Sequence, residues 1–231
     1  MKYIESPATI IDVGANCGYV TATMAQENDQ ASYICIEPEP LFNTYLRANV
    51  ASLRSLRPDI QVTILEELVG KSMNNAMLQN TGGTSVAVPG GGRMMARTLD
   101  DIMRGVSGPR VRLLKSDVDG FDYDVLESAG ELILSQRPPI YFECQHDTED
   151  QKEGFEKTIT WLSSVGYARW ALFDNFGALI MVVEDTRLIL SLMNYIMRQT
   201  RGQGTRTIYY MDIFCVCPED VALMEAALES Y

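Results

Sequence analysis

Strand-like and helix-like segments alternate along most of this chain, and that order limits the folds open to it. Short runs rich in β-branched residues occupy 8–13, 31–37, 60–65, 111–115 and 140–144. Strands that alternate with helices and connect by right-handed crossovers form a doubly wound, mostly parallel sheet. Because such sheets bind ligands beyond the carboxyl ends of their strands, the loops that follow these runs are the places to look for a site.

The segments between these strands have the apolar spacing of helices. Residues 18–27 follow the first strand, and Pro40 opens the next helix at a position where its missing N–H costs little. Apolar residues three or four apart predict further helices within 121–133 and 155–162. This pattern indicates an α/β, Rossmann-like fold.

The pattern changes after Gly166. Residues 168–173 and 178–183 are two strand-like runs around a short polar turn, which predicts a hairpin. An apolar stripe over 189–197 predicts a helix, and 208–217 predicts a final strand. We therefore expect antiparallel strands near the C-terminus. No repeat or linker is visible, so we expect a single domain over 1–231.

Composition narrows the possible partners. The chain has 231 residues and a net charge of −12, and this acidity disfavours nucleic acid and anionic membranes as partners. No apolar stretch approaches the ~20 residues that span a bilayer, and no secretion signal is visible. The five cysteines include no CxxC pair, which favours reduced thiols and a cytoplasmic location. The single histidine, His146, excludes zinc sites that need two.

The loop after the first strand reads Asp12-Val-Gly-Ala-Asn-Cys-Gly18. Gly14 and Gly18 allow a tight turn and a close approach of a ligand, and Asn16 tolerates left-handed backbone. Glu37 ends the second strand, where an acid can accept hydrogen bonds from a ribose. The pattern is typical of a nucleoside cofactor, although a plain strand-to-helix turn also needs such glycines.

Two cofactors could use this arrangement. A nicotinamide dinucleotide favours GxGxxG, whose second glycine lets the pyrophosphate approach the helix. Here Asn16 stands at that position. S-adenosylmethionine carries no phosphate, tolerates a side chain there, and uses an acid at the start of the motif, which Asp12 supplies. An oxidoreductase therefore remains an alternative to a methyltransferase.

Several short blocks follow one another in a recognisable order over 8–217. The most specific is Leu114-Lys-Ser-Asp-Val-Asp-Gly-Phe-Asp122, and the others are 11–19, 36–40 with Asn49, 68–70, 98–101, 140–143, 173–177 and 210–213. In this order they resemble the FkbM family of S-adenosylmethionine-dependent methyltransferases. In the block at 114–122 the family usually has Lys-Ile-Asp-Val-Glu-Gly, so Ser116 and Asp119 are departures.

The resemblance implies an S-adenosylmethionine site around the first two loops. One group of residues shapes the methionine end, Glu37 and Pro38 hold the ribose, and Glu67 and Leu68 lie beside the adenine. The group at the methionine end comprises Asp12, Gly14, Asn16, Gly18 and Tyr19.

Transfer of a methyl group to a hydroxyl needs a group that removes the proton. Lys115 and Asp117 end the fourth strand, Glu143 and His146 end the fifth, and adjacent strands lie ~5 Å apart. His146 or Asp117 could be the general base. Alternatively Asp117 and Glu143, with or without His146, could hold a Mg²⁺ ion that acidifies the hydroxyl.

These observations favour an O-methyltransferase acting on a small molecule or a sugar, and such an enzyme could form a homo-oligomer. A nicotinamide-dependent oxidoreductase and a non-catalytic protein on the same scaffold remain alternatives. The glycine-rich stretch 82–92 could be a lid over substrate or a disordered loop. Acceptor specificity would then come from 82–92, from the helix near 187–200, or from a partner subunit.

Overall fold

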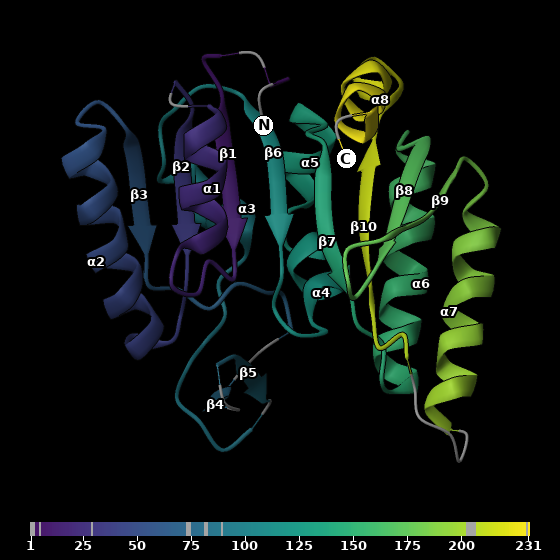
Figure 1. Cartoon of the computed structure of the whole chain (residues 1–231). Coiled ribbons are helices and arrows are strands. Elements are labelled where there is room, and N and C mark those ends of the chain that lie inside the picture. The colour runs from purple at the N-terminus through teal and green to yellow at the C-terminus, as the bar shows by residue number, and fades with distance from the viewer. Residues whose placement is uncertain are drawn as a thin grey trace.

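An eight-stranded sheet forms the centre of the protein in a computed structural model that describes residues 3–4, 6–28, 30–72, 75–80, 83–88, 90–201, 207–229 and 231 (Figure 1). Its strand order is β3–β2–β1–β6–β7–β10–β8–β9. The strands are β1 Thr9–Val13, β2 Ser32–Ile36, β3 Gln61–Leu65, β6 Val111–Ser116, β7 Ile140–Cys144, β8 Arg169–Asp174, β9 Leu179–Val183 and β10 Met211–Val216.

Helices cover the sheet and follow its strands in the predicted order. They are α1 Tyr19–Glu27, α2 Pro40–Leu56, α3 Leu99–Arg104, α4 Asp122–Glu127, α5 Gly130–Gln136, α6 Glu149–Ser164, α7 Thr186–Arg201 and α8 Val221–Glu229, the last preceded by the 3-10 turn Pro218–Asp220. A small second sheet pairs β4 Met77–Asn80 with β5 Ser85–Val88.

The pairing directions confirm the predicted doubly wound sheet. The pairs β3–β2, β2–β1, β1–β6 and β6–β7 are parallel, whereas β10 runs antiparallel to both β7 and β8, and β8 runs antiparallel to β9. The predicted hairpin is therefore β8–β9. Chain order reverses at β1, whose neighbours are β2 and β6, and this is the point where open α/β sheets place a ligand.

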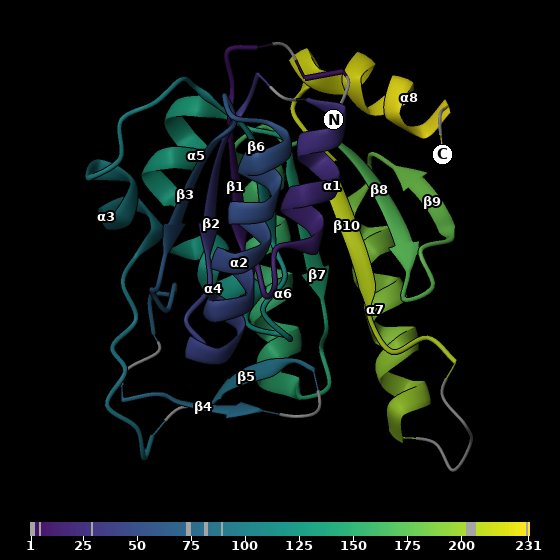
Figure 2. The ribbon, with the colours of Figure 1, turned by 60° about the vertical axis from the view of Figure 1, so that its left-hand side comes forward.

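Alternate residues along the strands pack into two separate hydrophobic cores, one on each face of the sheet. Ile11 and Leu114 pack with Leu126 and Phe155 from α4 and α6 on one face, while Ile10 packs with helices α1 and α2 on the other. Figure 1 and Figure 2 show α1 and α2 on the opposite face from α3 to α6. Within the described ranges, no helix is both long and apolar enough to cross a bilayer.

Two of the expected elements differ from the structure. The apolar stripe over 121–133 is split into α4 and α5, because the carboxylate of Asp100 accepts hydrogen bonds from the N–H groups of Glu131 and Leu132 and so caps a new helix. Much of 82–92 is not a plain loop, since β5 pairs with β4 there. The expected turn at 201–205 lies almost wholly outside the described residues.

Candidate active site

Gly14 is the narrowest point of the turn between β1 and α1. Its φ is +74°, and a Cβ at this position would lie 1.9 Å from the carbonyl oxygen of Asp117. The N–H of Gly14 donates to the carbonyl of Ile36, and the N–H of Asp117 donates to the carbonyl of Val13. Only glycine fits here, and the turn is thereby fixed between the ends of β2 and β6.

Asn16 ties this turn to two other segments. Its φ is +49°, its N–H donates to Oε2 of Glu37 over 2.8 Å, and its Nδ2 donates to the carbonyl of Gly83 over 3.2 Å. Asn49 closes the far side of the turn by donating to the carbonyl of Cys17. The asparagine that excludes a dinucleotide fingerprint therefore holds the acid at the end of β2.

Glu37 is the buried acid predicted to hold a ribose. It is 5% exposed, and its two carboxylate oxygens accept backbone N–H groups from Asn16 and Glu39, each over 2.8 Å. Burial raises the pKa of Glu37, and the two N–H donors oppose that rise. A carboxylate offers about four acceptor positions, so both oxygens retain capacity for hydroxyl donors.

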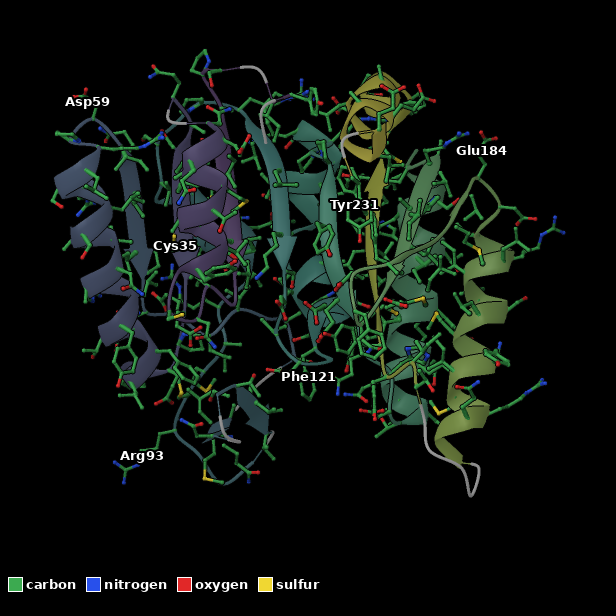
Figure 3. The ribbon with its side chains drawn as sticks, in the orientation of Figure 1. Cys35, Asp59, Arg93, Phe121, Glu184 and Tyr231 are labelled. Carbon is green, nitrogen blue, oxygen red and sulfur yellow. The ribbon has the colours of Figure 1, made fainter. Side chains whose placement is uncertain are left out.

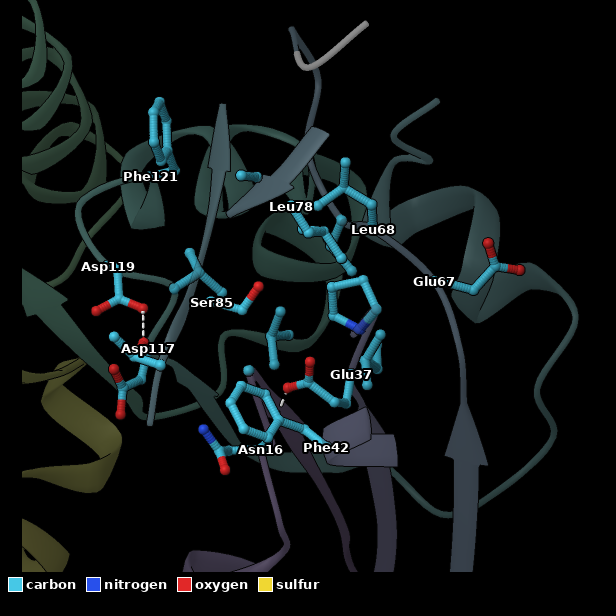
Figure 4. A pocket seen from close by; sticks show the side chains of 18 residues that line it. Asn16, Glu37, Phe42, Glu67, Leu68, Leu78, Ser85, Asp117, Asp119 and Phe121 are labelled. Carbon is cyan, nitrogen blue, oxygen red and sulfur yellow. Dashed lines mark hydrogen bonds between the residues drawn. The ribbon is translucent and has the colours of Figure 1, made fainter. Parts of the chain in front are cut away.

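These groups border a cavity of about 200 Å³ beyond the carboxyl ends of β1 and β2 (Figure 4). Apolar walls come from Phe42, Leu68 and Val69, and Glu37 and Pro38 form the side next to β2. Leu68 and Glu67 both border the cavity as predicted, but the carboxylate of Glu67 points away from it and pairs with Arg97.

The β4–β5 hairpin covers this cavity, and both ribbon views place it beyond the carboxyl ends of the parallel strands (Figure 2). Leu78 and Ala87 of the hairpin border the cavity, and Ala87 packs in a small cluster with Phe121 and Leu68. The Thr84 hydroxyl donates to the carboxylate of Asp119. Figure 3 shows Phe121 beside the hairpin. The glycine-rich stretch thus takes part in a cover over this cavity.

Asp12 and Lys115 form a buried pair under the turn. Lys115 Nζ lies 3.0 Å from Oδ1 of Asp12 and 3.4 Å from Asp117, and Thr21 of α1 donates to Asp12 over 2.7 Å. Burial alone would lower the pKa of Lys115, but the two carboxylates outweigh it and the pKa rises. Lys115 therefore stays charged and cannot accept a proton at neutral pH.

Asp117 borders a second cavity as well as the first. This cavity, of about 480 Å³, extends over one face of β6, β7 and β10. Side chains alternate along strands, so every second residue points into it, namely Leu113, Lys115, Tyr141, Glu143, Asp212 and Phe214. The carboxylate side chain of Asp117 is 50% exposed. Among the described residues that border the two cavities, Asp117 is the one they share.

Glu143 and Asp212 form the acidic part of the second cavity. They are directly opposite each other in the antiparallel pair β7–β10. Burial first, and then the neighbouring carboxylates, raise the pKa of Glu143 to about 9. Burial raises the pKa of Asp212 to about 6, opposed by a hydrogen bond from Tyr141. At neutral pH Glu143 is therefore mostly protonated and Asp212 mostly ionised.

The departure Ser116 has a partner of its own. Its hydroxyl donates to Oδ1 of Asp122 over 2.6 Å, and the N–H of Val118 donates to the same oxygen. Burial raises the pKa of Asp122 to about 8. A hydroxyl therefore replaces the family's apolar residue where a buried carboxyl needs a hydrogen bond.

The structure does not bring His146 to the acceptor side. The ring is 1% exposed, with Nδ1 3.0 Å from the carbonyl of Cys144 and Nε2 3.1 Å from the carbonyl of Met193. His146 joins the end of β7 to α7, and it borders neither of the two cavities among the described residues. It follows Cys144, which faces the core beneath α6 and α7, whereas Glu143 faces the second cavity.

Three predicted cofactor residues support the turn without bordering the first cavity in the described structure. Asp12 is buried beneath it, and Gly18 begins α1 with φ +83°, where a Cβ would lie 2.6 Å from Leu46. Tyr19 is 75% exposed. Gly14, Asn16, Glu37 and Pro38 do border it. Only part of the predicted turn therefore faces the cavity.

The predicted Mg²⁺ ligands lack a third partner. Asp117 and Glu143 both border the second cavity, yet the described residues contain no group of three His, Cys, Asp or Glu side chains placed to hold a metal ion. Because Mg²⁺ is usually held by one or two carboxylates together with water or substrate, the Mg²⁺ site stays a prediction.

Sequence reasoning missed Asp212 and Tyr141 as site residues. The available signal for Asp212 was an acid within the apolar run of β10, which is costly unless it has a function or a partner. Tyr141 gave no signal, because a tyrosine in a strand is ordinary.

The model of the methyltransferase FkbM domain family matches residues 12–168 of this chain. The chain belongs to the FkbM methyltransferase family. The match covers the turn at Gly14, the acid Glu37 and the segment around Asp117, and it ends before the β8–β9 hairpin. The family resemblance derived from the sequence is thereby confirmed.

Solved structures share the fold at low identity. The FkbM methyltransferase of Methylobacillus flagellatus KT has a TM-score of 0.47 and 15% identity over 68% of this chain, which spans only 37% of that FkbM chain. The fibrillarin/Nop5p complex has 0.50 and 11%, covering 93% of this chain and 74% of that one. A SAM-dependent O-methyltransferase of Thermotoga maritima has 0.46 and 13%, covering 93% and 61%. No curated protein matches the chain. The sheet is an α/β, Rossmann-like methyltransferase fold.

Proposed function

We propose that the protein is an S-adenosylmethionine-dependent methyltransferase that methylates a hydroxyl of a small molecule or sugar. One observation carries the proposal: two cavities, one built around a glycine turn and a buried acid, meet at the single carboxylate of Asp117. A donor in one cavity and an acceptor in the other would meet there. Membership of the FkbM family supports the reaction class.

In this proposal the cofactor occupies the first cavity. Glu37 accepts hydrogen bonds from the ribose hydroxyls, and Leu68 with Phe42 forms the apolar surroundings of the adenine. The methionine part lies over the turn at Gly14 and Asn16, which brings the sulfonium toward Asp117. Neighbours of the same fold have been described as SAM-dependent or in complex with SAH, which supports this choice of cofactor.

The proposed chemistry places Asp117 as the general base. The acceptor oxygen attacks the methyl carbon as the carbon–sulfur bond breaks, S-adenosylhomocysteine leaves, and the hydroxyl proton passes to the Asp117 carboxylate. Lys115 holds that carboxylate at 3.4 Å. Asp212 and Glu143 would hydrogen-bond the acceptor, with Glu143 as a donor while it is protonated.

The proposal also covers the location of the protein, its need for a metal ion and its oligomeric state. A cytoplasmic location agrees with the burial of Cys35, Cys144, Cys215 and Cys217. The proposed chemistry needs no metal, so activity should survive EDTA, and a requirement for Mg²⁺ would restore the metal prediction. A homo-oligomer stays a prediction for sedimentation to examine.

Calorimetry with S-adenosylhomocysteine tests the proposal directly. The intact protein should bind it with micromolar affinity, and Glu37→Ala should weaken binding about 100-fold, because two hydrogen bonds to a charged group are lost. Glu66→Ala is the matched control, since Glu66 lies at the end of β3, pairs with exposed Arg47 and leaves the cavity unchanged. No binding to the intact protein would reject the proposal, and fluorescence of NADH on mixing would reveal the oxidoreductase alternative.

A further inference from the structure

The two ends of the second cavity differ in chemistry. One end is apolar, and its lining comes from the strand residues Leu113 and Phe214, from Pro139 just before β7, and from Leu223 of α8 and Met24 of α1. The opposite end, beside Asp117, is lined by side chains that carry acid groups. A molecule that fills this cavity of about 480 Å³ must therefore be amphipathic, and the volume is within the usual range for small ligands.

The acidic end has more negative groups than positive partners. Asp117, Glu143 and Asp212 border it, and Lys115 is the cation among the described residues that line it. That ammonium already has Asp12 at 3.0 Å and Asp117 at 3.4 Å. Glu143 and Asp212 thus face each other from the adjacent strands β7 and β10, and neither forms an ion pair with another described residue.

Glu143 supplies an independent sign that a ligand group is missing. The residue is 6% exposed, and its Oε2 atom has no hydrogen-bond partner among the described residues. A buried carboxyl oxygen without a partner is costly, so it usually marks a position that a donor fills. Glu143 borders the cavity but its Oε2 atom is buried, so a rotation of this side chain would bring Oε2 to a donor on whatever occupies the cavity.

We propose that the second cavity binds an amphipathic amine, whose protonated nitrogen lies between Glu143 and Asp212 and whose apolar chain lies along Leu113 and Phe214 toward α8. The further statement that this amine is the methyl acceptor rests on the function proposed above. The hydroxyl of the acceptor would then lie next to the ammonium, within reach of Asp117. Carboxylates and phosphates are excluded from this end by like charge.

An organic amine fits better than a bare metal ion. The described residues provide no group of three metal-ligating side chains, and more than half of the named lining is apolar. An ammonium needs only hydrogen-bond acceptors and opposite charge: both facing carboxyl groups offer acceptor oxygens, and the ionised Asp212 supplies the charge. The apolar end gains stability from burying a hydrocarbon chain, which a metal ion does not offer.

Three probes of matched size separate the possibilities. They are 2-(octylamino)ethanol, which carries a cation, 1,2-decanediol, which is neutral, and decanoate, which is an anion. Calorimetry on the intact protein in EDTA-containing buffer should give an affinity for the amine about tenfold or more above that for the diol. Decanoate should give no saturable binding. Equal affinity for the three probes would overturn the proposal.

Variants locate the binding. Glu143→Gln and Asp212→Asn should each weaken the amine about tenfold while changing diol binding little. Glu153→Gln is the control, because Glu153 lies exposed on α6 and pairs with Lys157. Unchanged amine affinity in both cavity variants would overturn the site. Leu223→Ala should weaken amine and diol alike.

A parallel titration with S-adenosylhomocysteine keeps the two proposals apart. A protein that prefers the amine but does not bind S-adenosylhomocysteine retains the amine site and loses the proposed function. A protein that binds S-adenosylhomocysteine but shows no preference among the three probes keeps the function and loses the amine site.

Discussion

The two cavities that meet at Asp117 are constructed in different ways. The first cavity, which we propose holds the cofactor, is shaped by backbone: a turn with left-handed residues at Gly14 and Asn16, N–H groups that hold Glu37, and a hairpin laid over the top. The second cavity is shaped by side chains that project from one face of β6, β7 and β10. The first therefore depends on local conformation, whereas the second depends on how distant strands are aligned.

The largest effect should come from Gly14→Ala, which acts where the two cavities join. Its Cβ would overlap the carbonyl of Asp117, and φ +74° is strained for alanine. We expect the free energy of unfolding to fall by about 3 kcal/mol or more in urea denaturation, with loss of S-adenosylhomocysteine binding. Gly130→Ala is the control, because a Cβ there meets no atom within 4 Å. Equal stability of the two variants would contradict the geometry of the turn.

Asp117→Asn should separate catalysis from cofactor binding. An amide cannot accept the hydroxyl proton, so kcat should fall about 100-fold or more while the affinity for S-adenosylhomocysteine changes only a few-fold. The assay uses radiolabelled S-adenosylmethionine and an acceptor found by screening small molecules and glycans from lysate. Asp119→Asn is the control, since Asp119 binds Thr84 of the hairpin. A kcat loss as large in the control would remove Asp117 from its role.

The contrast between the cavities also explains what the sequence could predict. Gly14, Asn16 and Glu37 lie within or directly after the first two strands, and their roles follow from local turn chemistry and strand order. The parallel sheet and the β8–β9 hairpin were predicted for the same reason. The sequence leaves the β4–β5 cover open between a lid and a disordered loop, because its strands are short and the residues around them are rich in glycine.

The side-chain cavity needed information that one strand does not carry. Asp212 becomes a site residue only because β10 aligns it opposite Glu143. The sequence predicts His146 beside Glu143 because the two are close along the chain. In the structure Glu143 faces the second cavity, whereas Cys144 and His146 are directed to the core near α7. Such an assignment depends on register and on where a strand ends, which periodicity does not determine.

The free energy of unfolding of the protein should decrease as pH rises, because of two buried carboxyl groups. Asp122 and Glu143 have folded pKa values raised to about 8 and about 9, so between about pH 4 and these values the folded state binds more protons than the unfolded state. The free energy of unfolding then falls with pH, by at most about 1.4 kcal/mol per unit for each group. This is opposite in sign to an ordinary ion-paired carboxylate.

Urea midpoints between pH 5 and pH 8 measure this slope. Asp122→Asn removes one of the two groups and should flatten the decline, whereas Glu153→Gln, at an exposed position on α6, should leave it unchanged. A midpoint that rises with pH, or the same slope in Asp122→Asn, would show that these carboxyls are ionised in the folded protein.

The smallest effect should come from Thr84→Val, which tests whether the hairpin belongs to the cofactor cavity alone. The substitution keeps the side-chain shape and removes the hydroxyl that donates to Asp119. One neutral-to-charged hydrogen bond at a partly exposed position should weaken S-adenosylhomocysteine binding about three- to tenfold. Amine binding in the second cavity should be unaffected, because the hairpin does not border that cavity in the described part of the chain.

Calorimetry with both ligands on the same preparation makes the comparison. If amine affinity fell with that of S-adenosylhomocysteine, the hairpin would couple the two cavities, and the separation drawn between backbone-built and side-chain-built regions would fail at Asp119.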